Sequence, residues 1–271
     1  MRAAPLSTFA VVALLVLAGC SGLPVTGEGE PTPDASPSDF PNASAIDHSV
    51  FDTHAAAMGN TSFTLTTEMV QKDRVPWNDE KNFSYKNETA QYLAEPSDSQ
   101  YLVHTTGYFS VNGSTYSNGS TVYVLAQENN ETTVTVQPVF ITSVLNESGE
   151  NYLWRGGLLG DEYDSGAINA TYERKGIEMF QGVPVMRYEA TGPDALTGGW
   201  APSENASWNY ETFSATLLLD EDGIVRHYQY KFVRPPELLD NVRYSRTYTL
   251  SDVGTTNVEK PDWAMNATTG S

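Results

Sequence analysis

The fold of this chain is decided by residues 213–232, FSATLLLDEDGIVRHYQYKF. Apolar residues alternate with small or polar ones up to Leu219, and the alternation resumes from Ile224 to Phe232. A period of two is typical of a β-strand with one buried face. Asp222-Gly223 between two such runs indicates a tight hairpin. The carboxylates of this turn lack the ligand spacing of a calcium loop, which favours a plain turn over a cation site.

On both sides of this hairpin in the sequence, apolar side chains recur at every second position along most of the chain. Residues 46–58 differ, because their apolar side chains have helical spacing after Ser44, a candidate N-cap, and stop at Gly59-Asn60. Residues 138–146 are also apolar at helix-like spacing, and the glycine-rich residues 154–160 predict a loop or short mobile segment. The predicted strands are 63–69, 84–94, 101–111, 121–126, 132–136, 183–190, 213–219, 224–232 and 242–250.

The order of these elements predicts the architecture. Strands that follow one another over short connections pair antiparallel. A single sheet must bury one face against another element, and residues 46–58 and 138–160 are the candidates. We therefore expect an α+β protein, mostly antiparallel β, in which a strongly curved sheet forms an unclosed half-barrel with helices packed on the concave face.

The charge of the chain argues against a nucleic-acid partner. Its 271 residues include 34 Asp and Glu against 15 Lys and Arg, a net charge of −19 at pH 7. A protein that neutralises phosphates needs a basic face, so we expect no binding to DNA or RNA. Aromatic residues make up 11% of the chain, more than a wholly disordered acidic chain carries, and this predicts a packed core.

The first twenty residues resemble an export signal. Arg2 precedes an unbroken apolar run at 9–17, and Ala18-Gly19-Cys20 ends the segment. A bilayer span takes about 20 apolar residues, so this shorter run predicts a signal peptide. Small residues before a cysteine resemble the lipobox of prokaryotic lipoproteins, in which Cys20 would receive a diacylglyceryl group. The alternative is an ordinary cleavage site with a cysteine nearby by chance.

These signals divide the chain into four parts. Residues 1–19 are the signal peptide, and 20–44 are the lipidated cysteine with an acidic tether rich in Pro, Gly and Ser. Residues 45–263 form a single half-barrel domain, and 264–271 a disordered tail. Two acyl chains suffice for stable anchoring. We therefore expect a lipid-anchored, extracellular protein on the outer face of the cell membrane, with membrane lipid as a partner through Cys20.

The sequence contains more N-glycosylation motifs than chance predicts. The pattern Asn-x-Ser/Thr occurs at 11 of the 17 asparagines, against about 3 expected by chance. Glycans would place these side chains at the surface, although Asn-Gly-Ser at two of them also suits hairpin turns. Only 6 lysines accompany acidic residues spread along the whole chain, which favours a halophilic, archaeal source over a local acidic patch. The candidate sites are Asn42, Asn60, Asn82, Asn87, Asn112, Asn118, Asn130, Asn146, Asn169, Asn205 and Asn266.

The sequence contains no constellation typical of catalysis. Cys20 is the only cysteine, and the four histidines lack the spacing of a metalloprotease helix. His54, on the apolar face of residues 46–58, is expected to be a core histidine with a satisfied ring nitrogen. Cross-strand ion pairs are expected for Arg226, Arg243 and Arg246. We predict no catalytic residue, no metal site and no cofactor, and therefore no enzyme.

Several motifs together resemble an uncharacterised group of haloarchaeal cell-surface lipoproteins. They are the lipobox, the acidic tether, the helix at 46–58 with Asn60-Thr61-Ser62-Phe63-Thr64-Leu65 after it, the Gly182–Tyr188 strand, the Asp222–Arg226 turn and the terminal Pro261-Asp262-Trp263. That group is similar in layout to LolA-like carriers and to the LppX- and LprG-type lipoproteins. The resemblance covers about residues 45–263 and implies an unclosed β-barrel with an apolar cavity for acyl chains. The resemblance assigns no catalytic residue to this chain.

The resulting hypothesis is a non-catalytic, membrane-tethered protein that binds a hydrophobic ligand, such as an archaeal lipid or the lipid part of another lipoprotein. Residues 154–160 would be the mobile rim through which an acyl chain enters, with an ordinary loop as the alternative. The rival is a structural glycoprotein of a halophilic archaeal envelope with no ligand cavity. A hydrolase is the weakest hypothesis, because no nucleophile and base can be nominated. The residues expected to line the cavity are Phe63, Leu65, Met69, Phe213, Leu217, Leu219, Tyr228, Tyr230 and Phe232.

Overall fold

The computed structural model describes residues 35–41, 48–74, 83–107, 112–128, 131–138, 170–197, 210–234 and 243–267. Among these residues, no helix combines the length and apolarity needed to cross a membrane. In chain order the elements are η1 (Pro37–Asp39), α1 (His48–Met58), β1 (Phe63–Arg74), β2 (Phe83–Glu95), η2 (Pro96–Asp98), β3 (Gln100–Gly107), β4 (Gly113–Asn118), β5 (Thr121–Glu128), β6 (Glu131–Pro138), β7 (Glu173–Phe180), β8 (Val183–Thr191), η4 (Pro193–Ala195), β9 (Thr212–Leu219), β10 (Val225–Val233), β11 (Arg243–Ser251) and α4 (Asp262–Met265).

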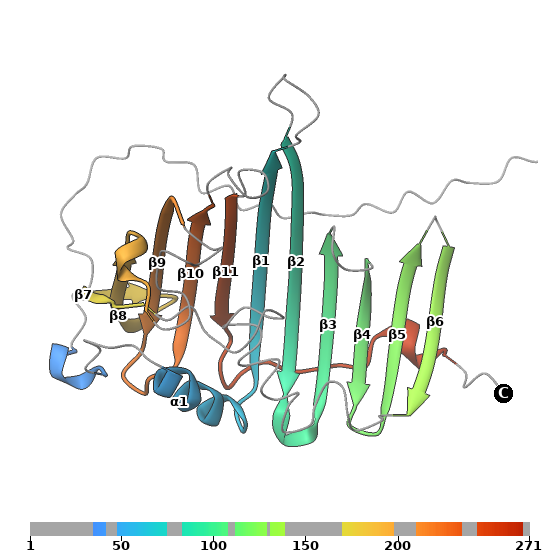
Figure 1. The fold of residues 1–271 in the computed structure, drawn as a ribbon. Coiled ribbons are helices and arrows are strands. Elements are labelled where there is room, and N and C mark those ends of the chain that lie inside the picture. The colour runs from blue at the N-terminus through green and yellow to red at the C-terminus, as the bar shows by residue number, and fades with distance from the viewer. Residues whose placement is uncertain are drawn as a thin grey trace, which may run out of the picture. The chain divides into compact units, whose positions relative to one another are not determined.

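The strands form one sheet in the order β6-β5-β4-β3-β2-β1-β11-β10-β9-β8-β7 (Figure 1). Every strand pair is antiparallel. The runs β1–β6 and β7–β11 each connect neighbours in sequence, and the pairing of β1 with β11 joins them. The expectation of a mostly antiparallel β protein with one large, curved and unclosed sheet is confirmed. The predicted hairpin at the Asp222-Gly223 turn is confirmed as β9 and β10.

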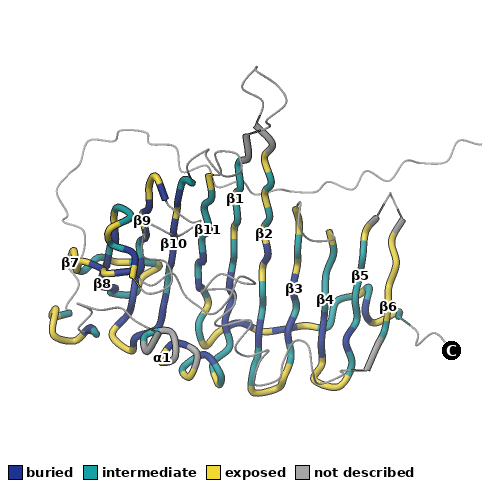
Figure 2. Tube along the Cα trace, viewed as in Figure 1, coloured by how far each residue is buried: buried dark blue, intermediate teal, exposed yellow. Residues whose placement is uncertain are grey.

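One face of the sheet, here named the core face, carries Phe63 and Leu65 of β1. The register places Leu65 opposite Leu250 of β11 and Tyr92 of β2, so their side chains point to the same face. Buried residues from this face of β1 and β8–β11 form one large hydrophobic cluster, to which α1 contributes Met58. Burial is concentrated on β8–β10, whereas Thr132 to Thr135 of β6 are exposed (Figure 2).

The C-terminal segment packs on the opposite face of the sheet. Thr64 points to this face because it alternates with Phe63 and Leu65, and its hydroxyl lies 3.1 Å from that of Thr256. Val258 and Ala264 form a second buried cluster there with Tyr116 of β4. Ala264 is 0% exposed and the description continues to residue 267, so the predicted boundary between domain and tail at 263 cuts through α4.

Residues 35–41, here named the docked segment, belong to the domain and not to a free tether. Phe40 is only 4% exposed and is part of the large cluster. Arg174 of β7 donates to two carbonyl oxygens of the segment, at 2.6 and 3.3 Å. The Tyr188 hydroxyl of β8 donates to the Pro41 carbonyl at 2.6 Å. A tether extending to residue 44 is therefore wrong for these residues, because one aromatic side chain and three carbonyls have partners on the sheet.

Two strands, β4 and β7, are absent from the sequence prediction. The sequence of β4, GSTYSN, has one large side chain and no visible alternation. In β7 the register shifts between Arg174 and Gly176, and this bulge interrupts the period of two. Apart from Pro138, which ends β6, the segment 138–160 lies outside the described residues. The expected second helical element and the rim at 154–160 therefore stay predictions.

Candidate functional site

Eight of the nine residues expected to line a cavity lie together in the large buried cluster. Met69 is the ninth, and it is half-buried on the same face of β1. Phe63, Leu217 and Leu219 are 0% exposed, and a side chain with no exposure has no water-sized space beside it. In this structure these three side chains pack against protein on all sides. Their contact with a ligand stays a prediction.

Burial on the core face falls from one end to the other along β1 and β11, whereas Phe213 of β9 and Phe232 of β10 stay buried (Figure 2). Along β1 the exposed fraction is 0% at Phe63 and 5% at Leu65, and Met69 is half-buried. Along β11 it is 3% at Leu250, and Arg246 is half-buried. We name the two parts the sealed end (Met58, Phe63, Leu65, Leu217, Leu219 and Leu250) and the open end (Met69, Gln71, Tyr244 and Arg246).

Five rings between the two ends form what we name the aromatic cluster: Tyr228, Tyr230, Phe232, Tyr244 and Tyr248. Alternation along β10 and β11 places all five on the core face, and the register pairs Phe232 with Tyr244. The centroids of these two rings are 5.0 Å apart, and those of Tyr228 and Tyr248 are 6.3 Å apart. Such contacts each contribute about 0.5–1.5 kcal/mol beyond burial. The cluster therefore holds its hydroxyl groups in defined positions.

One hydroxyl of the aromatic cluster lacks a partner. The Tyr172 hydroxyl donates to that of Tyr228 over 3.4 Å, and burial raises the pKa of Tyr172 to about 12. The Tyr248 hydroxyl is equally buried but forms no hydrogen bond with any described residue. An unsatisfied buried hydroxyl costs about 1–3 kcal/mol. Burial also raises the pKa of Tyr248, so this group is a protonated donor without an acceptor.

Arg246 lies beside this hydroxyl at the open end. Its guanidinium carbon is 5.3 Å from the centroid of the Tyr248 ring. The residues opposite Arg246 are Tyr230 on β10 and Met69 on β1. No described residue forms an ion pair with Arg246, so the expected cross-strand ion pair is wrong here: neither neighbouring strand places a carboxylate opposite it.

Two buried polar side chains near the sealed end, Asp220 and His54, have hydrogen-bond partners. The buried Asp220 carboxylate accepts hydrogen bonds from the Ile224 amide at 2.8 Å and from Arg226 Nε at 2.7 Å. His54 Nδ1 accepts from the Val225 amide at 3.2 Å, and burial, with a smaller effect of Arg226, lowers the pKa of His54 to about 3. The expectation of a satisfied core histidine is confirmed. Among the described residues, no three His, Cys, Asp or Glu side chains are placed to hold a metal ion.

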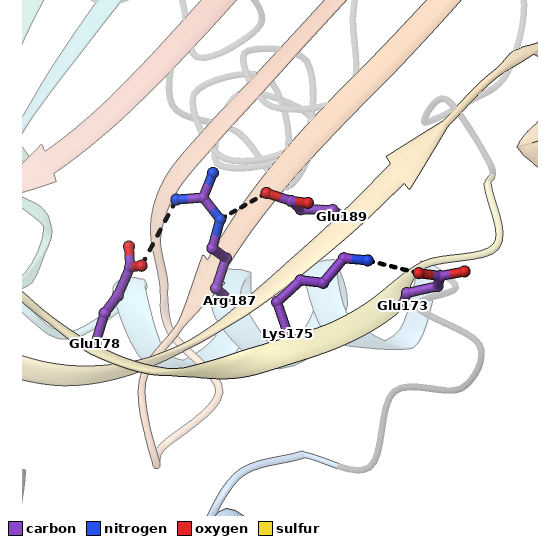
Figure 3. A network of polar contacts seen from close by, with 5 residues as sticks. All are labelled: Glu173, Lys175, Glu178, Arg187 and Glu189. Carbon is purple, nitrogen blue, oxygen red and sulfur yellow. Dashed lines mark hydrogen bonds and ion pairs between the residues drawn. The ribbon is translucent and has the colours of Figure 1, made fainter.

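Charged side chains near the β7 edge are paired in solvent (Figure 3). Arg187 Nε lies 2.7 Å from Glu189, and Arg187 Nη1 lies 3.6 Å from Glu178. Lys175 lies 2.6 Å from Glu173. Because these side chains are 31–76% exposed, solvent screens each pair and its contribution to stability is small. Arg187 alternates with Tyr188, so this network lies on the face opposite the aromatic cluster.

Five candidate glycosylation sites lie within the described residues, and all five are exposed. Two of them also shape turns: Asn118 accepts from the Thr121 amide at 2.9 Å, and Asn112 accepts from the Gly107 amide at 2.9 Å. Their glycosylation stays a prediction. The other six sites and Cys20 lie outside the described residues. The five are Asn60, Asn87, Asn112, Asn118 and Asn266.

Residues 5–267 match one protein family, described as a family of unknown function (DUF7537). The chain belongs to this family. No curated protein matches the DUF7537 chain. Among solved structures it is similar to LprF from Mycobacterium bovis, with 10% identity, a TM-score of 0.38, and 79% of this chain and 95% of that one covered.

Two further structures are similar to the DUF7537 chain. Lipoprotein LppX of Mycobacterium tuberculosis has 11% identity and a TM-score of 0.29, with 79% of this chain and 100% of LppX covered. A domain from Vibrio parahaemolyticus, described as an outer membrane lipoprotein-sorting protein, has 11% identity and a TM-score of 0.22. That match covers 80% of this chain and 95% of the domain.

Three polar residues of the DUF7537 site were not among the sequence-predicted lining residues. They are Tyr244, Arg246 and Tyr248, which occupy alternate positions of one strand and therefore share the core face. The alternation of Tyr, Arg and Tyr in YSRTY was the available signal. An arginine between two tyrosines on a buried face indicates a polar site inside an otherwise apolar surface.

Proposed function

We propose that this protein is a non-catalytic lipoprotein that holds a hydrophobic, lipid-like ligand against the core face. In this proposal Cys20 carries the lipid anchor, and the domain lies outside the cell membrane. In this proposal the core face is the concave side of the curved sheet, and α1 closes its sealed end. The ligand lies at the open end and reaches the aromatic cluster.

The observation that carries the proposal is the unpartnered Tyr248 hydroxyl. A core that serves stability alone is filled with apolar groups or with polar groups that satisfy one another. Here a buried donor lies among aromatic rings without an acceptor in the part of the chain that the structure describes. A ligand with an acceptor atom next to an apolar chain would satisfy the donor and cover the rings.

The open end has the composition that such a ligand requires. Met69 supplies an apolar surface, while Tyr244 and Arg246 supply polar atoms, and all three are half-buried. Ligand pockets are mostly apolar with a few polar groups that fix orientation. The open end combines both kinds of group on two neighbouring strands, β1 and β11.

A second candidate function is a structural surface glycoprotein, and the sealed end favours it. Phe63, Leu217 and Leu219 are completely buried, as in a filled core. The five described candidate glycosylation sites are exposed, which suits a glycan-covered surface. In that function the protein binds no apolar ligand at either end.

Ligand binding separates the two candidates. Native mass spectrometry of full-length protein, gently extracted from membranes, should detect a co-purifying lipid. An uncharged fluorescent acyl probe should bind the parent protein, and Met69→Trp should block that binding by filling the open end. Val134→Trp on β6 is the matched control, because Val134 is 39% exposed and lies at the far edge of the sheet. If no lipid co-purifies and the probe does not bind, the structural glycoprotein is the better account.

The anchor is tested separately. Cys20→Ser should release the folded protein from membranes, because the thioether to the diacylglyceryl group can no longer form. The measurement is the distribution of the protein between membrane and soluble fractions after high-salt and carbonate washes. Retention of the variant in the membrane fraction would refute the anchor.

A further inference from the structure

Arg246 differs from Arg226, Arg187 and Arg174 in what its guanidinium contacts. Arg226 is paired with Asp220 at 2.7 Å, and Arg187 lies between two glutamates (Figure 3). Arg174 donates to backbone carbonyls of the docked segment. Arg246 has no carboxylate partner among the described residues, although acidic residues outnumber basic ones more than twofold in this chain.

The surroundings of Arg246 supply further donors. The Tyr230 hydroxyl interacts with the guanidinium, and the charge of Arg246 also acts on the Tyr248 hydroxyl. Burial nevertheless raises the pKa of both tyrosines above the ordinary value, so both keep their protons. A guanidinium has five N–H donors and accepts no hydrogen bond. The site therefore has an excess of donors over acceptors.

Among the carboxylates whose side chains the structure describes, none on the same face neutralises this excess directly. On the core face, Glu88 of β2 is opposite Met69, which separates it from Arg246. Two strand spacings place Glu88 and Arg246 about 10 Å apart at the backbone. Lys86, two residues along β2, points to the same face and opposes the charge of Glu88.

From this arrangement we propose that Arg246, with the hydroxyls of Tyr230 and Tyr248, binds the negatively charged head of an amphiphile. The head is a phosphate or a carboxylate, and the apolar chain lies over Met69 and Phe232 on either side of Arg246. This inference rests on the proposed function and specifies its ligand class. A bidentate contact between a guanidinium and such an anion is the geometry for which arginine is suited.

The net charge of −19 does not prevent this binding. At physiological ionic strength the Debye length is about 8 Å, so carboxylates farther away are largely screened. A direct contact in a half-buried site is screened much less. The contact with Arg246 therefore outweighs the long-range repulsion from the acidic surface.

Head-group preference is the direct test. Full-length protein is titrated, at fixed salt, with probes of one acyl chain that end in a phosphate, an alcohol or a quaternary ammonium group. Inorganic phosphate alone is a fourth titrant. The phosphate-headed probe should bind at least about 10-fold more tightly than the alcohol-headed one, since hydrogen bonds to charged groups are the stronger class. Inorganic phosphate should bind far more weakly than the phosphate-headed probe.

Two substitutions of Arg246 test whether this residue causes the preference for the phosphate head. Arg246→Gln should weaken binding of the phosphate-headed probe by about 10-fold or more and leave the alcohol-headed probe unchanged. Arg246→Lys should keep part of the preference, because lysine keeps the positive charge but cannot form the bidentate contact of a guanidinium. Arg243→Gln is the matched control, since Arg243 is exposed on the same strand and points to the other face.

Tyr248→Phe keeps the test informative if Arg246→Gln does not fold. It removes the unpartnered hydroxyl, so the melting temperature should stay equal or rise while the affinity for the phosphate-headed probe falls. Equal affinity for the phosphate and alcohol heads would overturn the inference and leave the proposed function standing. Equal affinity for inorganic phosphate and the phosphate-headed probe would overturn the amphiphile in favour of a free anion. If none of the four titrants binds, the inference and the proposed function both fail.

Discussion

The sealed and open ends of the core face use the same strands in different ways. At the sealed end, apolar side chains are 0–5% exposed, and the buried side chains of His54 and Asp220 have hydrogen-bond partners, as in the bond from the Val225 amide to His54. At the open end, Met69 and Arg246 are half-buried, and the adjacent Tyr248 hydroxyl has no acceptor among the described residues. The difference separates an end that is closed by apolar packing from an end that is only partly buried, and the ligand site is proposed at the second.

The largest expected effect is the loss of a sealed side chain. Phe63→Ala should lower the free energy of unfolding by about 3–5 kcal/mol, because it removes a fully buried ring and leaves a cavity. Met69→Ala, six residues along the same strand, should cost about 1 kcal/mol, since that side chain is already partly in solvent. Urea unfolding of both variants measures the contrast. Equal losses would show that the two ends are packed alike.

Replacing a side chain by a larger one should also affect stability more at the sealed end than at the open end, with a smaller difference between the two. Leu217→Trp should destabilise the protein by about 1–3 kcal/mol, because a completely buried site has no room for a larger ring. Met69→Trp should cost less than about 1 kcal/mol and extend over the open end. Thermal melts of the two variants are the measurement. If Leu217→Trp is tolerated, the sealed end contains space, and the cavity expected at Leu217 would be supported.

Acid should weaken the sealed end through His54. Burial keeps the folded-state pKa at about 3, below the ordinary value of 6.5, so the unfolded state binds one more proton between these two pH values. Stability from this group is complete above pH 6.5, falls by about 1.4 kcal/mol by pH 5.5, and continues to fall toward pH 3. His54→Gln should remove this part of the pH dependence. The free energies of unfolding of parent and variant at pH 7.5 and 5.5 give the comparison, and parallel losses would contradict it.

Local signals made part of this structure predictable. The β9–β10 hairpin followed from alternation on both sides of Asp222-Gly223, and Gly223 has the positive φ of 76° that this turn requires. His54 was recognisable as a core residue because its place on an apolar helix face restricts its environment. In both cases the deciding residues lie within a few positions of one another.

Features that depend on distant partners were not predictable. The docked segment reads as a linker, and its contacts come from Arg174 and Tyr188, more than 130 positions away. The partners of Arg246 depend on the register of three strands, which places Tyr230 and Met69 opposite it. A one-residue slip in either pairing would have turned different residues toward Arg246. Register is a property of the assembled sheet, so the absence of a carboxylate beside Arg246 among the described residues became visible only with the strands in place.

The docked segment also sets how far the domain can move from its anchor. With Cys20 as the proposed anchored residue, only residues 21–34 remain between the lipid and the docked segment. Fourteen residues extend to at most about 50 Å. Because docking involves β7 and β8, the docked segment holds the chain at one edge of the sheet. If Cys20 is anchored as proposed, that edge of the sheet can lie no farther than about 50 Å from the anchor.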